Sequence, residues 1–362
     1  MDQLNKIFIS IILPIRNEEK FIDKTLDSII HQNPPLNKAD YEILVADGCS
    51  DDKTVEIVKK YQNKFSNIIL VQNKNKIVPT GFNKALSKSK GNIIIRVDGH
   101  SVISDDFISS CIVAFKKIEA DCVGGFTEHI AKGFFGEIIN LCQTSKFGVG
   151  NVYFRNKQKE GKYVDTLAFG AYKRELFKEF GAYDEELVRN QDDEFNFRII
   201  QNKKKIWLDP SIKSKYFARS SLFKLAIQYF QYGFYKVRVI QKRKGIASWR
   251  HLIPSTFVLA IIGFTLLFLL NISKVPIFLL LSAYFFANIF STIFIIFANI
   301  RFTLISIFKN VFCLPILIPI TFIIIHLSYG IGFLLGLCYY VNSWKNTRII
   351  NENFDEVMFG ES

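Results

Sequence analysis

The chain has 362 residues, enough for one large domain and further structure, and its net charge is +13, from 46 Lys and Arg against 33 Asp and Glu. This excess of positive charge indicates a polyanionic partner or an anionic membrane surface. The six cysteines lack the CxxC spacing of zinc clusters and redox pairs, and scattered single thiols are typical of a reducing compartment.

The N-terminal stretch MDQLNKIFISIILPIRNEE does not fit a signal peptide. Its apolar run is short, breaks at Pro14 and leads into charges without a small-residue cleavage site. We expect residues 7–13 to form a buried strand instead. Strand-like segments at 41–47, 67–73 and 92–98 then alternate with helix-like segments at 18–32, 54–62 and 80–88. This order predicts repeated βαβ units and an α/β fold with a mostly parallel sheet.

Polar and mostly acidic residues follow the apolar runs, and in parallel sheets ligands bind outside the carboxyl ends of the strands. These residues are Pro14, Arg16, Asn17 and Glu18 after the first strand, Asp47, Ser50 and Asp51 after the second, and Asp98 and His100 after the fourth. Neither GxGxxG after the first strand nor GxxxxGK[ST] occurs. The expected nucleotide is therefore neither a Rossmann dinucleotide nor a P-loop triphosphate.

An acidic rim repels bare phosphate, so the pattern implies a divalent metal ion. Asp98 and His100 flank Gly99 at a strand end, where both side chains could turn toward one ion. Oxygen ligands suit Mg²⁺ or Mn²⁺, and the imidazole favours Mn²⁺. Such an ion would hold a diphosphate and stabilise it as a leaving group. Taken alone, a D-x-H triplet is also typical of an ordinary turn.

Five segments together resemble an inverting family-2 glycosyltransferase with the GT-A fold, over residues 7–240. They are PIRNEE, VADGCSDD, PTGFNKAL, GNIIIRVDGH and NQDDEFNFR. The later HLSYGIGFLLG, residues 326–336, is similar to the membrane-anchored subgroup of the succinoglycan or exopolysaccharide type. The resemblance implies transfer of a sugar from a nucleotide-diphosphate sugar to a membrane-held, lipid-linked or glycan acceptor, with Mn²⁺ or Mg²⁺ as cofactor.

The resemblance also implies roles for single residues. Pro14, Arg16, Asn17 and Glu18 would line the nucleotide pocket. Asp47 would contact the base, with Ser50 and Asp51 shaping its loop, although a loop-capping role is the alternative for Asp47. Asn83 and Arg96 would lie near the sugar diphosphate. Asp98 and His100 stand at the family's D-x-D metal motif, where His replaces the second Asp.

Inverting transfer needs one carboxylate to deprotonate the acceptor hydroxyl. Asp192 stands where the family has this base, while Gln191 replaces the usual Glu. The adjacent Asp193 and Glu194 are further candidates for the base. The alternative role for Asp192 is that of a helix N-cap. Lys173 or Arg174 would meet a pyrophosphate, or would be solvated helix charges. A Q-x-x-R-W motif of processive synthases is missing, so we expect one sugar per encounter.

The composition changes sharply at residue 252. From Leu252 to Val341 the charged residues are Lys274, Arg301 and Lys309 alone, and this region contains three hydrophobic segments, 252–270, 275–300 and 311–341. A spanning helix needs about 20 apolar residues. The third segment could be one long tilted helix or a re-entrant piece followed by a span. We expect four regions: a domain at 1–220, an interfacial helix at 221–250, a membrane region at 251–341 and a polar tail at 342–362.

Residues 236–251 contain six Lys and Arg and no acid, which under the positive-inside rule places the first domain in the cytoplasm of a multi-pass plasma-membrane protein. Residues 222–240 are amphipathic and predict a helix on the membrane surface. A helix packed on the soluble domain is the alternative. With three spans the tail would be outside, although Lys345 and Arg348 argue against this.

The sequence thus favours a membrane-anchored glycosyltransferase that contacts membrane lipids and has no nucleic-acid partner. One alternative is a transporter or channel with a regulatory nucleotide-binding domain, but the spans contain no acidic residue to line an ion path. The other alternative is a domain that binds a nucleotide sugar without turnover.

Overall fold

A computed structural model describes residues 7–37, 40–131, 133–150, 152–217, 221–246, 248–299 and 313–352. The chain forms two compact units. We call them the sheet unit (residues 1–129, 153–217 and 348–362) and the helical unit (residues 130–152 and 218–347). The expected division at residue 220 therefore needs two corrections. Residues 130–152 belong with the hydrophobic helices, and residues 348–352 of the polar tail belong with the first domain.

The sheet unit contains nine described strands in the order β3-β2-β1-β4-β8-β6-β9-β5, with β7 beside β9. The strands are β1 (Ile9–Ile15), β2 (Tyr41–Asp47), β3 (Ile68–Gln72), β4 (Ile93–Arg96), β5 (Ser101–Ile103), β6 (Cys122–Ile130), β7 (Lys162–Tyr163), β8 (Ala171–Lys173) and β9 (Ile206–Phe217). Strands β3, β2, β1 and β4 are parallel, as predicted. Because β8 joins β4 and β6 in antiparallel pairs, the whole sheet is mixed.

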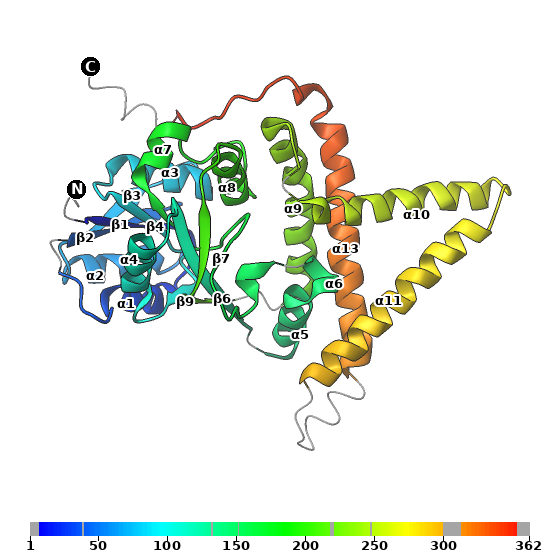
Figure 1. The fold of residues 1–362 in the computed structure, drawn as a ribbon, viewed down its shortest axis with the longest axis horizontal. Helices are drawn as coiled ribbons and strands as arrows, with labels where there is room; N and C mark the ends of the chain where they lie inside the picture. Colours follow the sequence, from blue (N-terminus) through cyan, green and yellow to red (C-terminus); the bar gives the residue numbers. More distant parts are fainter. Residues whose placement is uncertain are drawn as a thin grey trace. The chain divides into compact units, whose positions relative to one another are not determined.

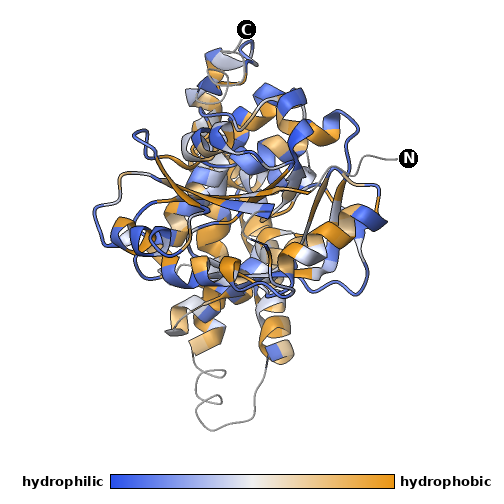
Figure 2. Ribbon diagram, turned by 90° about the vertical axis from the view of Figure 1, so that its left-hand side faces the viewer, coloured by the Kyte–Doolittle hydropathy of each residue, from blue (hydrophilic) through white to orange (hydrophobic). Residues whose placement is uncertain are grey.

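Helices cover both faces of this sheet (Figure 1). One face packs against α1 (Ile22–Ile30), α2 (Thr54–Gln62) and α4 (Phe107–Lys117), and the other against α3 (Val78–Lys88), α7 (Arg174–Phe180) and α8 (Gln191–Gln201). Side chains alternate between the faces of a strand. Ile11 and Leu13 accordingly join the first core, and Ile12 joins the second. Figure 2 shows the resulting hydrophobic strands with hydrophilic loops around them.

The described part of the helical unit contains α5 (Gly133–Thr144), α6 (Lys146–Val149), α9 (Leu222–Arg243), α10 (Ile253–Leu269), α11 (Val275–Asn299) and α13 (Leu314–Tyr339). Among the described residues, three helices are long and apolar enough to cross a membrane: Trp249–Leu269, Val275–Asn299 and Leu314–Tyr339. Short 3-10 turns lie at Tyr153–Arg155 in the sheet unit, and at Trp249–His251 and Val341–Ser343 in the helical unit. The third hydrophobic segment is one helix that contains Pro319, within its described part.

Helix α9 packs along α13 in the helical unit. Small residues bring the two backbones together. A side-chain carbon at Gly332 would overlap the carbonyl oxygen of Phe230, and one at Gly233 would overlap that of Tyr329. Close approach of helices through glycine is common in membrane proteins.

Candidate active site

The candidate site lies at the carboxyl ends of the parallel strands β1, β2 and β4. Strand β1 is paired with β2 and β4 in parallel register, so the residues that follow these strands reach one edge of the sheet. Pro14 is buried within β1 opposite Ala46, while Arg16 and Asn17 are exposed directly after the strand. The predicted gathering of polar residues at this edge therefore exists in the fold.

Hydrogen bonds join the first two loops. The hydroxyl of Ser50 donates to the Asp47 carboxylate at 2.5 Å and accepts the N–H of Asn17 at 2.9 Å. The Asn17 side-chain oxygen in turn accepts the N–H of exposed Asp51 at 3.1 Å. Asn17 and Cys49 adopt left-handed backbone conformations, with φ of 56° and 57°, which turn the chain sharply after each strand. Asp47 is buried and organises this loop, as its alternative role predicted.

His100 is paired with a carboxylate of the first loop. Its Nδ1 lies 2.7 Å from Oε1 of Glu18, whose own backbone N–H donates to the Thr54 hydroxyl at 2.7 Å. The edge of the His100 ring packs on Tyr216, with ring centroids 4.8 Å apart. The structure thus places one predicted metal ligand against a predicted nucleotide-pocket residue.

Arg96 lies between the two carboxylates that the sequence singled out. Its Nε and Nη2 contact Oδ1 of Asp98 at 3.0 and 2.9 Å, and its Nη1 lies 3.3 Å from Oδ2 of Asp192. The Arg96 side chain is 7% exposed, against 22% for Asp98 and 32% for Asp192. Burial by itself lowers the pKa of Arg96, but Asp98 and then Tyr183 and Asp192 outweigh it and raise that pKa well above its usual value. The guanidinium is therefore a permanent positive charge in the site.

Asp192 lies in the first turn of α8. The N-cap of α8 is Asn190, in a left-handed conformation with φ of 64°, so the alternative role of Asp192 as the helix N-cap is wrong. Its Oδ1 accepts the N–H of Asp193 at 3.0 Å. Burial raises the pKa of Asp192, Arg96 opposes this rise, and the negative charges of Asp193 and Asp98 reinforce it. A carboxylate with a raised pKa is a stronger base, which suits proton abstraction.

Several other predicted residues serve the fold. Asn83 is fully buried, its amide donates to the Tyr183 carbonyl and the Glu185 carboxylate, and its oxygen accepts the Tyr183 N–H. It therefore holds the loop at Tyr183–Glu185. Glu194 is equally buried in an ion pair with Arg198, at 2.5 Å, so it cannot replace Asp192 as a base.

The two basic candidates upstream have structural contacts as well. Arg174 donates to the Gly91 carbonyl, and to the Ser89 hydroxyl at 2.6 Å. Lys173 lies 3.9 Å from Asp121 and over the Phe115 ring. Arg174 is therefore held by the residues before β4, whereas the Lys173 side chain is 44% exposed, as its alternative role as a solvated charge predicted.

Sequence reasoning missed Tyr183. This buried ring stacks on Phe82 with centroids 4.2 Å apart, and the Arg96 guanidinium lies 5.8 Å from its centre. Tyr183 thus forms the floor under the central cation. A lone tyrosine in GAYDEEL looks like any core aromatic, so no local signal distinguished it.

Comparison with known proteins identifies the family. The family described as "Glycosyl transferase family 2" matches residues 10–181. A dolichyl N-acetyl-alpha-D-glucosaminyl phosphate 3-beta-D-2,3-diacetamido-2,3-dideoxy-beta-D-glucuronosyltransferase of Methanococcus voltae is 32% identical over 264 residues, which cover 71% of this chain and 80% of that protein. The chain belongs to glycosyl transferase family 2. This glycosyltransferase is also 25% identical to the succinoglycan biosynthesis protein ExoA of Rhizobium meliloti, over 70% of its own length and 76% of that protein.

A solved structure supports the fold of this glycosyltransferase. The mannosyltransferase PcManGT of Pyrobaculum calidifontis, in complex with GDP-Man and Mn²⁺, superposes with a TM-score of 0.58. It is 15% identical, and the match covers 91% of this chain and 88% of that one. The predicted GT-A fold is thereby confirmed.

Proposed function

We propose that this glycosyltransferase moves a sugar, with inversion, from a nucleotide-diphosphate sugar to a lipid-linked saccharide, for a cell-surface polysaccharide or a glycolipid. The observation that carries the proposal is the buried Arg96 between Asp98 and Asp192. A fixed cation between two carboxylates is a preorganised electrostatic site for charge that develops during transfer. The printed names of the two relatives, one acting on a dolichyl-linked sugar phosphate and one in succinoglycan synthesis, support this class of acceptor.

The donor would bind along the loops that follow β1 and β2. Arg16 and Asn17 are exposed there, and Asp47 would position the base-binding loop through Ser50. The Ser50 hydroxyl connects both loops, so it would set the width of the nucleotide pocket. Since the chain lacks the Q-x-x-R-W motif, we propose a single transfer per encounter.

A divalent ion would need phosphate oxygens of the nucleotide-sugar donor as additional ligands at this site. Within the described residues, no three His, Cys, Asp or Glu side chains form a ready-made metal cluster. The partly exposed Asp98 uses Oδ1 toward Arg96, and Mg²⁺ and Mn²⁺ are commonly held by one or two carboxylates together with substrate phosphates. We propose Asp98 as the ligand, with His100 acting through Glu18. When bound, the ion would neutralise charge on the departing nucleoside diphosphate.

Asp192 is proposed as the base. Inversion requires the acceptor hydroxyl to attack the anomeric carbon from the face opposite the diphosphate while a carboxylate takes its proton. Asp192 retains 32% exposure, so an acceptor can reach it. The opposing effect of Arg96 on its pKa favours the ionised form that can accept a proton.

The test is release of nucleoside diphosphate by the purified full chain, given a panel of nucleotide sugars and a lipid-linked acceptor. We expect Asp192→Asn and Asp98→Asn each to abolish release, and Asp192→Asn to retain donor binding. The exposed Asp105→Asn is the matched control and should keep full activity. Donor binding by the unaltered chain without turnover on any acceptor would instead favour a binding domain.

A further inference from the structure

The end of the chain returns to the sheet unit. The carbonyl oxygen of Ile350 accepts the N–H of Glu185 at 2.6 Å, and the Ile350 N–H donates to the buried Asp184 carboxylate at 3.4 Å. The neighbouring Asn351 is also buried. Residues 348–352 are thus part of the same compact unit as the candidate active site. A compact unit lies on one side of a membrane, so the chain between residues 218 and 347 must cross an even number of times.

Helices α9 and α13 run in the same direction. This direction determines whether the two helices can cross the bilayer. Phe230 lies beside Gly332 and Phe234 beside Gly336, and the Gln241 amide donates to the Tyr340 carbonyl at 2.8 Å. Residue numbers therefore rise together along both helices. The pair is about 33 Å long, from the 22 residues of α9, close to the thickness of a hydrocarbon core.

The beginning of α9 and the end of α13 lie at opposite ends of this pair. The first follows the sheet unit after Phe217, and the second leads into it at Arg348. If α9 and α13 both crossed the bilayer, the start of α9 and the end of α13 would lie on opposite sides of the membrane. The sheet unit is joined to both of these ends, and it cannot lie on both sides. Residues buried in α9 also oppose a crossing: Lys236, Arg238 and Lys242 are charged, and charge in the hydrocarbon region is costly.

We propose that α10 and α11 cross the bilayer as a hairpin, while α9 and α13 lie in the plane of the leaflet that faces the sheet unit. The exposed side of α13 would contact the acyl chains of this leaflet. It carries large apolar residues with spacings of three, four and eight: Ile316, Ile320, Ile323, Ile331, Leu335 and Tyr339. Arg238 would remain at polar depth, where its Nη1 donates to the Ser343 carbonyl at 3.0 Å.

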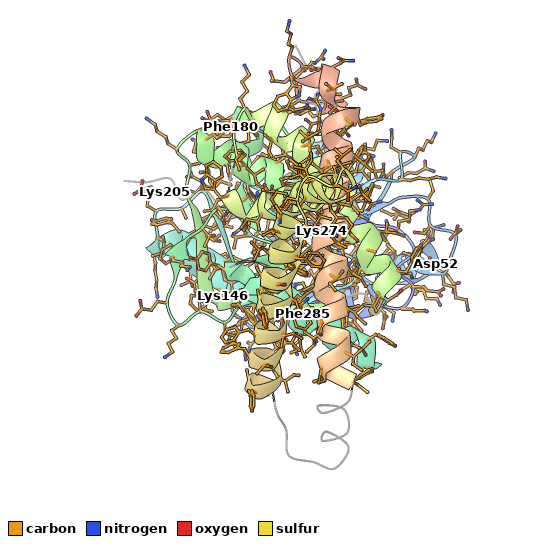
Figure 3. The ribbon with its side chains drawn as sticks, turned by 90° about the vertical axis from the view of Figure 1, so that its right-hand side faces the viewer. Asp52, Lys146, Phe180, Lys205, Lys274 and Phe285 are labelled. Atoms are coloured by element: carbon orange, nitrogen blue, oxygen red, sulfur yellow. The ribbon has the colours of Figure 1, made fainter. Side chains whose placement is uncertain are left out.

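The distribution of charge supports this topology independently. Between α10 and α11 the chain carries one cation, Lys274, at the turn of the hairpin (Figure 3). Phe285 lies along α11 and is 59% exposed, as expected for a side chain that meets lipid. Other cations flank the opposite ends of these helices: Arg243, Lys244 and Arg250 before α10, Arg301 and Lys309 after α11, and Lys345 and Arg348 after α13. The positive-inside rule places all three of these groups on one side.

Cysteine labelling of the full chain tests the proposal. In a background with the six native cysteines replaced, single cysteines are introduced as Lys64→Cys in the sheet unit, Ile272→Cys at the hairpin turn and Lys345→Cys after α13; all three native side chains are exposed. A membrane-impermeant maleimide is applied to intact and to permeabilised cells. We expect the cysteines at 64 and 345 to react on the same side and the cysteine at 272 on the opposite side.

Two outcomes would overturn the proposal. If the cysteine at 345 reacts on the side opposite to the cysteine at 64, α13 crosses the bilayer. If the cysteine at 272 reacts on the same side as the cysteine at 64, the hairpin does not cross. Should the cysteine-free background fail to fold, the natural chain with a tag at each end is digested in sealed vesicles instead. Because the proposal places both ends of the chain on one side of the membrane, the two tags must be cleaved together or protected together. The labelling and the digestion do not depend on the proposed transfer reaction.

Discussion

Replacement of Arg96 by Met tests the proposed site most directly, because it removes the buried charge and retains much of the apolar volume. The carboxylates of Asp98 and Asp192 would then share the site without their cation. Loss of one partner from a buried ion pair costs about 3–5 kcal/mol. Both carboxylates keep some exposure, 22% and 32%, so we expect the lower end, about 3 kcal/mol in the free energy of unfolding.

The same replacement changes the chemistry. Arg96 opposes the rise that burial causes in the pKa of Asp192, so without Arg96 that pKa rises further. A protonated Asp192 cannot accept a proton, and activity is lost as the pH falls through its pKa. We therefore expect the acidic limb of kcat/KM to move to higher pH. Loss of one preorganised electrostatic group also lowers kcat by roughly 10²-fold or more.

The assay is nucleoside diphosphate release across a pH series for the natural chain, Arg96→Met and Arg96→Lys, with denaturant unfolding of each. Lysine restores the charge but not the planar fork, so Arg96→Lys should fall between the other two. An Arg96→Met protein with the natural pH profile and the natural free energy of unfolding would refute the coupling of Arg96 to Asp192.

Three further changes have defined outcomes. Ser50→Ala removes the hydroxyl that joins the first two loops, and a net loss of about 1 kcal/mol per hydrogen bond should raise KM for the donor several-fold with little change in kcat. Glu194→Gln breaks the buried pair with Arg198 and should cost about 3–5 kcal/mol in denaturant unfolding. Gly332→Ala forces a side chain into the α9 backbone and should cost about 1–3 kcal/mol, seen as a lower melting temperature in detergent.

Matched controls separate these effects from general damage. Glu56→Gln breaks an exposed pair with Lys60 and should change the free energy of unfolding by less than about 1 kcal/mol. Gly263→Ala, in α10, meets no atom within 4 Å and should leave the melting temperature unchanged. Equal losses in each variant and its control would contradict the packing argument, and a large fall in kcat for Ser50→Ala would contradict its placement in donor binding.

Much of the fold could be predicted because it depends on local patterns. The continuous apolar runs and the helical spacings located β1, β2, β3 and β4 with their connecting helices, although β1 begins at Ile9 and not at Ile7. The antiparallel half of the sheet was not predicted. Strand β8 has three residues and β7 has two, and strands this short carry no periodic signal.

The sequence predicted the two carboxylates of the candidate site but not the contacts that they make. Carboxylates at strand ends pointed to Asp98, and the family resemblance pointed to Asp192. Which cation they share could not be predicted, because Arg96 and Asp192 are far apart in sequence and meet only through the packing of α8. The same holds for Glu18 and His100.

What the sequence by itself determined is the chemistry available in each region: polar residues at the ends of strands, cations before the first hydrophobic segment, and an apolar stretch from residue 252. Only the tertiary structure decided that residues 348–352 return to the sheet unit and that α9 covers α13. The hydrophobicity of a helix shows that its apolar surface must be kept from water. It does not show whether lipid or another part of the protein covers that surface. Close approach at glycines and hydrogen bonds between distant segments select the partner, and these exist only once the chain has folded.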